Sequence, residues 1–168
     1  MGRQINRKGF TLIEVVLVLA IGGLIFLLAF IAFQQVSTNR RDTQRRSDAA
    51  RVVAELQNYK SDANQFPETP STPFLSAAAS PASPEFEKFV GNYLGGENFK
   101  DPQGSRYLWL ADDSTFNSAT APGVIFNVTV WPAQYKKGAK CNNGNFVAGS
   151  GVAVRLKLET GTICRDDA

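Results

Sequence analysis

The stretch 10–33 contains a single charged side chain, Glu14, and it constrains the fold more than any other part of the chain. As an α-helix, its roughly 24 residues would be about 36 Å long, enough to cross a hydrocarbon core of about 30 Å. The small residues at a secretory cleavage site normally follow the apolar region, whereas the junction between Gly9 and Phe10 precedes it. Cleavage after Gly9 would remove a basic leader, residues 1–9, and leave the apolar segment attached as a membrane anchor.

Glu14 needs a compensating partner if this segment spans a membrane. A carboxylate in a spanning helix costs about 2.5–3.5 kcal/mol at the bilayer centre on insertion scales, and less near an end. Cleavage after Gly9 would create a new α-amine on Phe10, which is largely cationic at neutral pH. Glu14 could then pair with the amine of its own chain or of a neighbour. The alternative is a plain signal anchor in which Glu14 lies near the lipid headgroups.

The sequence from Gly9 through Phe10-Thr11-Leu12-Ile13-Glu14 to Val15 resembles the type IV pilin and pseudopilin family, whose precursors have a short basic leader before such a junction. The resemblance implies cleavage after Gly9 by a prepilin peptidase, methylation of the Phe10 amine, and pairing of Glu14 with the Phe10 amine of an adjacent subunit. It also implies an α+β pilin fold, in which a long N-terminal helix packs on a small antiparallel β-sheet head. The implied partners are other pilin subunits, the prepilin peptidase, the membrane, and an assembly platform with its ATPase.

Composition narrows the possible functions. The net charge of +3 equals the charge of Arg3, Arg7 and Lys8 in the leader, and removing these three from 18 basic residues leaves 15 against 15 acidic ones. Net charge therefore gives no support to nucleic-acid binding by the processed chain. The chain has no histidine and two cysteines, so a four-ligand Cys/His zinc site is unavailable. We expect a non-enzymatic protein without metal or cofactor.

A basic cluster follows the apolar segment and includes Arg40, Arg41, Arg45 and Arg46. One interpretation is a solvated helix face, with Asp42 pairing with Arg46 at i,i+4 and Asp48 with Arg51 at i,i+3. The other is a belt that contacts lipid headgroups, neighbouring subunits or DNA. Because this flank is at least as basic as the leader, charge alone does not orient the segment. The family resemblance and the expected disulfide place the leader in the cytoplasm.

The pattern of the remaining chain predicts its domains. Residues 10–33 are the transmembrane and filament-core helix, and 34–63 continue it as an amphipathic helix without proline. Residues 64–168 form a globular head that begins with a proline-rich linker, 67–84. The apolar residues expected on the inner face of the continuation are Val36, Ala49, Val52, Val53, Leu56 and Tyr59.

Within the head, a short helix is predicted to begin at Pro84, with Phe86, Phe89, Val90 and Tyr93 on one face, and to end at Gly95-Gly96. Alternating or β-rich patterns predict strands over 106–110, 123–131 and 152–158, and a turn at Thr160-Gly161 precedes a further strand over 162–164. These strands should form an antiparallel sheet packed on the long helix. Gln65-Phe66-Pro67 and Asp101-Pro102-Gln103-Gly104 are similar to stretches in the heads of pseudopilins and some pilins.

Several head residues have two interpretations. Cys141 and Cys164 are expected to form a disulfide in an exported domain, and the alternative is two free thiols. Asp112-Asp113 and Asp166-Asp167 are expected to be a turn and a frayed terminus rather than calcium ligands, and the sequon at Asn127 is uninformative. Four aromatic residues could form an exposed platform or the core: Tyr107, Trp109, Phe116 and Trp131.

Three functions remain open. The first is a structural subunit of a surface filament, held in the cytoplasmic membrane as a single-pass protein with its head outside before assembly. The second is a pseudopilin of a secretion or competence (DNA-uptake) pseudopilus. The third is a monomeric binding module that is anchored to the membrane. The sequence does not choose among motility, adhesion, secretion and DNA uptake.

Overall fold

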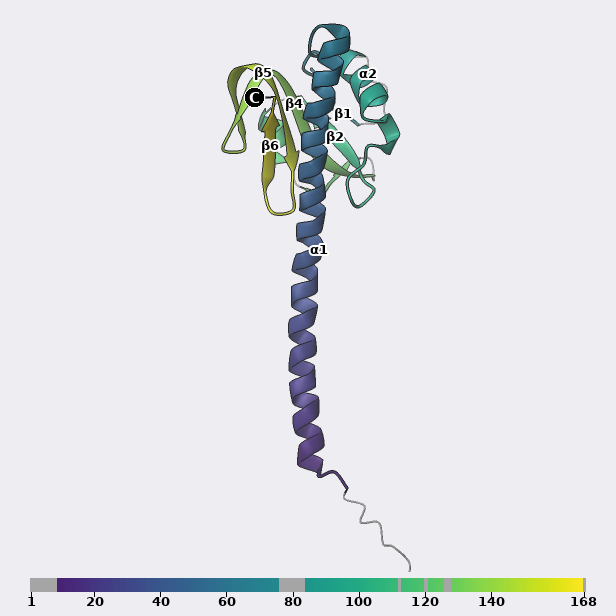
Figure 1. Cartoon of the computed structure of the whole chain (residues 1–168), viewed down its shortest axis with the longest axis vertical. Coiled ribbons are helices and arrows are strands. Elements are labelled where there is room, and N and C mark those ends of the chain that lie inside the picture. Colours follow the sequence, from purple (N-terminus) through teal and green to yellow (C-terminus); the bar gives the residue numbers. More distant parts are fainter. Residues whose placement is uncertain (1–8, 76–83, 112, 120, 126–127, 168) are drawn as a thin grey trace, which may run out of the picture. The chain divides into compact units, whose positions relative to one another are not determined.

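The computed structural model describes residues 9–75, 84–111, 113–119, 121–125 and 128–167 (Figure 1). The chain divides into two compact units, Met1–Asn39 and Arg40–Ala168. A long helix, α1, begins in the first unit, and the second unit contains the end of this helix and a six-stranded sheet. This arrangement confirms the predicted α+β class.

Helix α1 comprises Leu12–Ala63. Its buried residues all belong to the Arg40–Ala168 unit and recur every three or four positions: Asp42, Arg45, Ala49, Val52 and Leu56. This spacing places them on one face of the helix, as the amphipathic pattern predicts. Asn64 follows with a φ of 59°, a left-handed conformation that commonly ends a helix. The two buried residues nearest the first unit are charged, which the apolar pattern did not predict.

The segment after α1 lies along the sheet. Phe66 is buried, and the carbonyl oxygen of Pro67 accepts a hydrogen bond of 2.7 Å from the Tyr135 hydroxyl. Strand β1, Phe74–Leu75, follows, and residues 76–83 of the predicted linker lie outside the described residues. Helix α2 then spans Pro84–Tyr93 and buries Phe86 and Phe89, which confirms the predicted helix. A short 3-10 helix, η1, covers Gly96–Asn98.

The sheet has the strand order β1-β2-β4-β5-β6. These strands are β2 at Arg106–Leu110, β4 at Val128–Asn142, β5 at Asn145–Lys157 and β6 at Thr162–Asp166. Neighbours are antiparallel except β2 and β4, which are parallel. The expectation of a purely antiparallel sheet was therefore wrong at this pair. The chain crosses between them through helix α3, Asp113–Ser118, and strand β3.

The strand predicted over 123–131 is two strands in the structure. Strand β3 covers Gly123–Ile125 and pairs antiparallel with the start of β4, with Ile125 opposite Val128. The chain therefore reverses direction between these two residues. The prediction was wrong because the apolar alternation continues across the reversal. Phe126 and Asn127, the latter in the sequon, lie outside the described residues.

Strands β4 and β5 are longer than predicted. The expected strand ended at Trp131, but β4 continues through Pro132 to Asn142, although proline lacks the N–H that a central strand normally uses. On one side of β4, residues up to Val130 pair with β3 and residues from Ala133 pair with β5. Pro132 lies between these two pairing regions, where its missing N–H is tolerated. The β4–β5 turn has two successive left-handed residues, Asn143 and Gly144, a combination that suits a tight hairpin.

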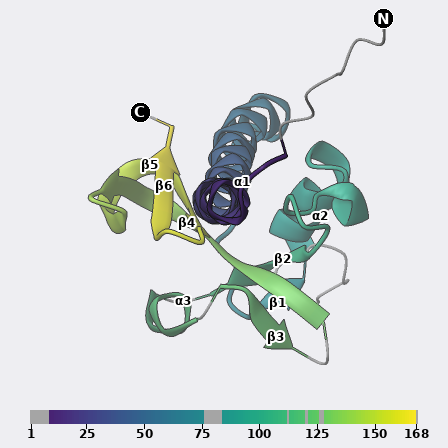
Figure 2. The ribbon, with the colours of Figure 1, turned by 90° about the horizontal axis from the view of Figure 1, so that it is seen from below.

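The two faces of the sheet carry separate clusters. On β2, Tyr107 and Trp109 belong to the cluster that includes Ala49, Val52 and Leu56 of α1. Leu108 and Leu110 point the other way and pack with Phe116 of α3. Figure 2 shows α3 on the side of the sheet opposite α1. Tyr107, Trp109, Phe116 and Trp131 are all buried, so the aromatic residues form core rather than an exposed platform.

The C-terminal residues are tied to the sheet. Cys141 and Cys164 form a disulfide, with their Cα atoms 5.7 Å apart. Asp166 accepts a hydrogen bond of 2.7 Å from the Cys141 N–H, and Asp167 accepts one of 2.9 Å from the Val152 N–H. The expectation of a frayed terminus at Asp166-Asp167 was therefore wrong, because both carboxylates receive backbone donors that the sequence pattern did not reveal.

Candidate functional site

The predicted processing junction lies at the start of the described chain. Gly9 and Phe10 are both exposed and precede the first turn of α1, and the Phe10 side chain is 89% exposed. An exposed junction outside the helix is accessible to a peptidase. The remainder of the predicted leader, residues 1–8, lies outside the described residues.

Thr11 and Glu14 form a reciprocal cap at the start of α1. The Glu14 Oε2 atom accepts hydrogen bonds from the Thr11 N–H at 2.9 Å and from the Thr11 hydroxyl at 2.7 Å. The Glu14 N–H donates to the Thr11 hydroxyl oxygen at 3.4 Å. This capping box satisfies helix-end donors that would otherwise be unpaired. The sequence-based account of Glu14 considered only an amine partner and missed this local role, although the Thr-x-x-Glu spacing signals it.

Beyond this cap, the Met1–Asn39 unit exposes an apolar helix surface. Every residue of α1 up to Val36 is exposed, including large side chains such as Leu19, Phe26 and Phe33. Among the described helices, α1 is long and apolar enough to cross a membrane by length and composition. A continuous apolar surface of this kind indicates contact with lipid or with other protein chains. Val36, predicted on the inner face of the amphipathic segment, is 49% exposed in the single chain.

The four arginines of the predicted basic belt have different surroundings. Arg40 and Arg46 are exposed, and no ion pair joins either to a carboxylate among the described residues. Arg41 contacts both carboxylate oxygens of Glu159, with distances of 2.6 and 2.9 Å. Arg45 is fully buried. The solvated-face interpretation is therefore wrong for Arg45.

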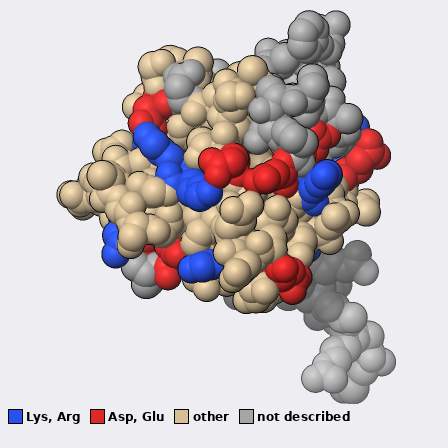
Figure 3. All heavy atoms as spheres, turned by 90° about the horizontal axis from the view of Figure 1, so that it is seen from above, with Lys and Arg blue, Asp and Glu red and all other residues tan. Residues whose placement is uncertain are grey.

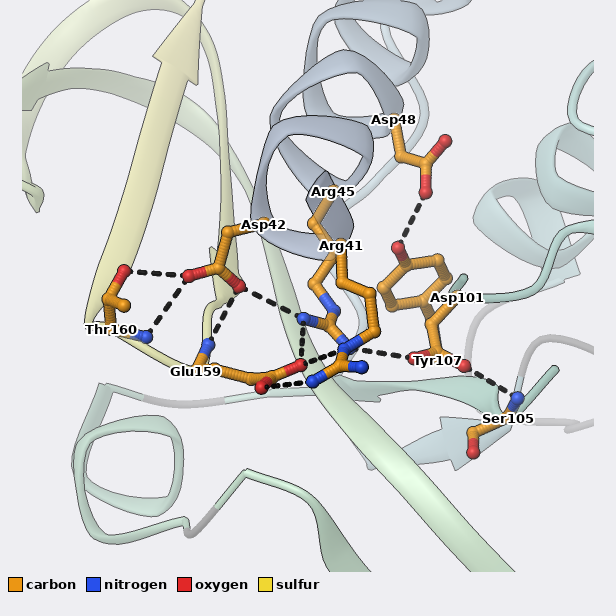
Figure 4. A network of polar contacts seen from close by, with 9 residues as sticks. All are labelled: Arg41, Asp42, Arg45, Asp48, Asp101, Ser105, Tyr107, Glu159 and Thr160. Carbon is orange, nitrogen blue, oxygen red and sulfur yellow. Dashed lines mark hydrogen bonds and ion pairs between the residues drawn. The ribbon is translucent and has the colours of Figure 1, made fainter. Parts of the chain in front are cut away.

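Arg45 is the centre of a polar network that joins three segments of the head (Figure 4). Its Nη1 atom contacts Asp42 at 3.0 Å and Glu159 at 3.1 Å, and its Nη2 atom contacts Asp101 at 3.0 Å. Its guanidinium carbon lies 3.4 Å from the centre of the Trp131 ring, close enough for a cation–π interaction. A buried arginine is stabilised in this way only when several acceptors surround it. The predicted pairing of Asp42 with Arg46 is replaced by this i,i+3 contact with Arg45.

Asp42 holds the turn between β5 and β6. Its carboxylate accepts hydrogen bonds from the Glu159 N–H at 2.9 Å, the Thr160 N–H at 3.1 Å and the Thr160 hydroxyl at 2.6 Å. Burial alone would raise the pKa of Asp42, but these hydrogen bonds and the one from Arg45 lower it on balance. The hydrogen bond from Arg41 is the main reason that the pKa of Glu159 is lowered.

Two further carboxylates extend the network. Asp101 accepts a hydrogen bond of 2.6 Å from the Ser105 N–H, so the predicted Asp-Pro-x-Gly turn is anchored to Arg45 of α1. Asp48 accepts a hydrogen bond of 2.7 Å from the hydroxyl of buried Tyr107. Burial is the largest cause of the raised pKa of Asp48 and also of the raised pKa of Tyr107. Asp48 was predicted to pair with Arg51, which instead donates to the Leu94 carbonyl at 3.4 Å.

Neither a metal site nor an active site stands out in the described part of the chain. No group of three or more Asp, Glu, Cys or His side chains there is arranged to hold a metal ion. Asp113 is paired with Arg155 at 2.6 Å, and Asp112 lies outside the described residues. On the face drawn in Figure 3, basic and acidic side chains are interspersed among uncharged ones. The network of Figure 4 joins α1 to the β5–β6 turn and to the turn at Asp101.

Comparison with known families identifies the N-terminal segment. Residues 5–30 match the model of the prokaryotic N-terminal methylation motif, the signal peptide of type IV pilins and pseudopilins. The match includes Gly9, Phe10, Thr11 and Glu14. No curated protein and no solved structure matches the chain significantly.

Proposed function

We propose that this protein is a structural subunit of a type IV pilus-like surface filament, cleaved after Gly9 by a prepilin peptidase and methylated at the Phe10 amine. The observation that carries the proposal is the methylation motif over residues 5–30, which overlaps the apolar part of α1 whose side chains, up to Val36, are all exposed in the single chain. A membrane covers this surface before assembly, and other subunits cover it in the filament.

The proposed domains follow from this role. Residues 1–9 are the leader, 10–33 the transmembrane and filament-core helix, 34–63 its amphipathic continuation, and 64–168 the head. The leader lies in the cytoplasm and the head outside, where the Cys141–Cys164 disulfide is favoured by an oxidising environment. The assembly platform and its ATPase extract the processed subunit from the membrane.

Glu14 is the proposed assembly residue. Its Oε2 atom accepts both hydrogen bonds from Thr11, which leaves the second carboxylate oxygen for a cation. The methylated amine of Phe10 in an adjacent subunit supplies that cation. A carboxylate and an amine that neutralise each other in an apolar filament core avoid the cost of two isolated charges.

Intact-mass analysis of protein taken from sheared surface filaments tests the proposal. The expected mass is that of residues 10–168 with the disulfide formed and one methyl group on the N-terminus. Gly9→Leu provides the matched variant and should leave the full-length precursor in the membrane. Filaments that contain the unprocessed chain, or a processed chain that never leaves the membrane, would contradict the proposal.

A pseudopilin is the second candidate, favoured by the similarity of Asp101-Pro102-Gln103-Gly104 to stretches in pseudopilin heads. Electron microscopy of cells labelled at the head separates the two roles, because long surface fibres containing this chain would exclude a purely periplasmic pseudopilus. The monomeric tether makes a different prediction. It would give no crosslinks between copies with cysteines introduced near Glu14.

A further inference from the structure

Two groups of charged side chains in the Arg40–Ala168 unit have no ion-pair partner among the described residues. The first group is Arg40 and Arg46, both exposed on α1. The second is Glu55, Asp62 and Glu85, which we call the acidic patch. None of these five side chains takes part in the ion pairs that the described residues form.

The acidic patch combines residues from the last turns of α1 with one from the first turn of α2, and Figures 1 and 2 show these two elements side by side. The rings of Tyr59 on α1 and Tyr93 on α2 are 5.5 Å apart. The Tyr93 hydroxyl donates a hydrogen bond of 2.6 Å to Asp62. The Oε2 atom of Glu85 is buried and has no hydrogen-bond partner in the described structure. A carboxylate oxygen left in this state favours a partner that brings donors or positive charge.

The carboxylates of the acidic patch also contribute to the raised pKa values of Tyr59 and Tyr93. The hydrogen bond to Asp62 is the largest cause of the raised pKa of Tyr93, and the charges of Asp62 and Glu55 contribute to it. Burial and then the charge of Glu85 raise the pKa of Tyr59. All three carboxylates therefore influence the same pair of neighbouring tyrosines.

The arginines and the acidic patch are too far apart to neutralise each other within one chain. Arg46 and Glu55 are separated by about 14 Å along the helix axis, and Arg40 and Asp62 by about 33 Å, at about 1.5 Å per residue. The two groups thus belong to different ends of the α1 segment within this unit.

We propose that Arg40 and Arg46 of one copy bind the acidic patch of a second copy. The contact rests on the proposed filament function and specifies which surfaces of the heads meet. In a filament whose copies run in the same direction, each copy keeps one group free for the next copy, so the contact propagates. Antiparallel copies would instead pair both groups at once and close as a two-fold dimer. Complementary charges of this kind set register and partner choice.

A second copy fits these charges better than a polyanion does. DNA or an anionic lipid could bind the arginines, but it would leave the carboxylates of the acidic patch without an ion-pair partner. A chain with 15 basic and 15 acidic residues after removal of the three leader cations supplies both charges itself. Successive contacts between copies pair the arginines of each copy with the acidic patch of the next.

Charge reversal and recombination test the contact in cells that assemble the full chain. Arg40→Glu with Arg46→Glu, and separately Glu55→Lys with Asp62→Lys, should each lower the filament yield at least about tenfold, because like charges then face each other. The four changes together should restore the yield to within about threefold of the wild type. Arg40→Lys with Arg46→Lys is the matched control and should assemble normally. A combined variant no better than the worse reversal would overturn the proposal.

Disulfide crosslinking tests the proposed contact even if a charge-reversed variant fails to fold. Arg46→Cys in one copy and Asp62→Cys in a tagged second copy should give a mixed disulfide within filaments, whereas Ser47→Cys with Lys88→Cys, which are also exposed but lie outside the groups, should not. Absence of the mixed product from assembled filaments would reject the contact. A wild-type chain that is processed but never assembles would instead reject the proposed function. Arginine reversals that lower DNA or vesicle binding without changing filament yield would assign the arginines to a polyanion.

Discussion

The two parts of helix α1 differ in whether their side chains are exposed or buried in the single chain. In the Met1–Asn39 unit, all described α1 side chains up to Val36 are exposed and nearly all are apolar. In the Arg40–Ala168 unit, one face is buried, and the first two buried residues, Asp42 and Arg45, are charged. The first part leaves its hydrophobic surface for partners outside the chain, whereas the second buries one face against its own head.

We therefore expect the exposed part to contribute to assembly and the buried face to contribute to folding of the head. The exposed part gains free energy only when lipid or other subunits cover it. The buried part holds the head through apolar contacts and the Arg45 network, neither of which needs another chain. Substitutions in the exposed apolar part and in the buried face of the second part should therefore affect different measurements.

The largest effect on folding is expected at Arg45. Arg45→Met removes the charge that faces Asp42, Asp101 and Glu159, and an acid left buried without its partner costs about 3–5 kcal/mol. Denaturant unfolding of the detergent-solubilised chain measures the loss. Arg46→Met is the control and should change the unfolding free energy by less than about 0.5 kcal/mol. Equal losses of unfolding free energy at the two positions would contradict the conclusion that Arg45 stabilises the head and Arg46 does not.

A leucine-to-alanine pair compares the two parts directly. Leu56 is fully buried, so Leu56→Ala should lower head stability by about 2–5 kcal/mol. Leu24 is 60% exposed in the single chain, so Leu24→Ala should leave the unfolding of the head unchanged. Near-UV circular dichroism during urea titration follows the head in both variants. A matching destabilisation by Leu24→Ala would show that the head depends on the apolar part.

The disulfide should stabilise the head without affecting membrane insertion. The Cys141–Cys164 bond closes a loop with a sequence separation of 23 residues, which the chain-entropy model values at about 3 kcal/mol. Changing both cysteines to serine should lower the unfolding free energy by about this amount. The variant should still fractionate with the membrane. Loss of the membrane fraction together with head stability would contradict the separation of the two parts.

Acid should weaken the polar network by a smaller, graded amount. The pKa values of Asp42 and Glu159 are lowered in the folded head, so their stabilisation is complete above their unfolded pKa values, about 3.9 and 4.3, and is lost as pH falls through the folded values. Stability measured from pH 6 to pH 2 should therefore decrease. Glu159→Gln should reduce the slope, and an unchanged slope would exclude Glu159 as a contributor.

Local patterns predicted much of the fold. Helix α2 and strand β2 were recognised because a proline start, an aromatic face and a β-rich run each act within a few residues. The parallel pairing of β2 with β4 was missed, since strand direction depends on a connection and not on the strands themselves. The reversal between Ile125 and Val128 was missed because apolar alternation does not record a change of direction.

The site was predictable only where its chemistry is local. Gly9, Phe10 and Glu14 form a continuous motif, so the processing and assembly residues could be proposed from the sequence. The burial of Arg45 could not, because its partners Asp101 and Glu159 are 56 and 114 residues away in the sequence. An arginine beside others of its kind is usually solvated, and here distant carboxylates and Trp131 make burial possible.

The central claim is that the exposed part of α1 assembles copies of the chain through Glu14. The most direct measurement compares the amounts of Glu14→Ala protein in the membrane and in sheared filaments. Thr11→Val is the matched control, because it removes the capping hydroxyl and keeps the carboxylate. The account predicts that Glu14→Ala is processed after Gly9 but stays in the membrane, while Thr11→Val still assembles. Filaments of Glu14→Ala at the wild-type level would contradict it.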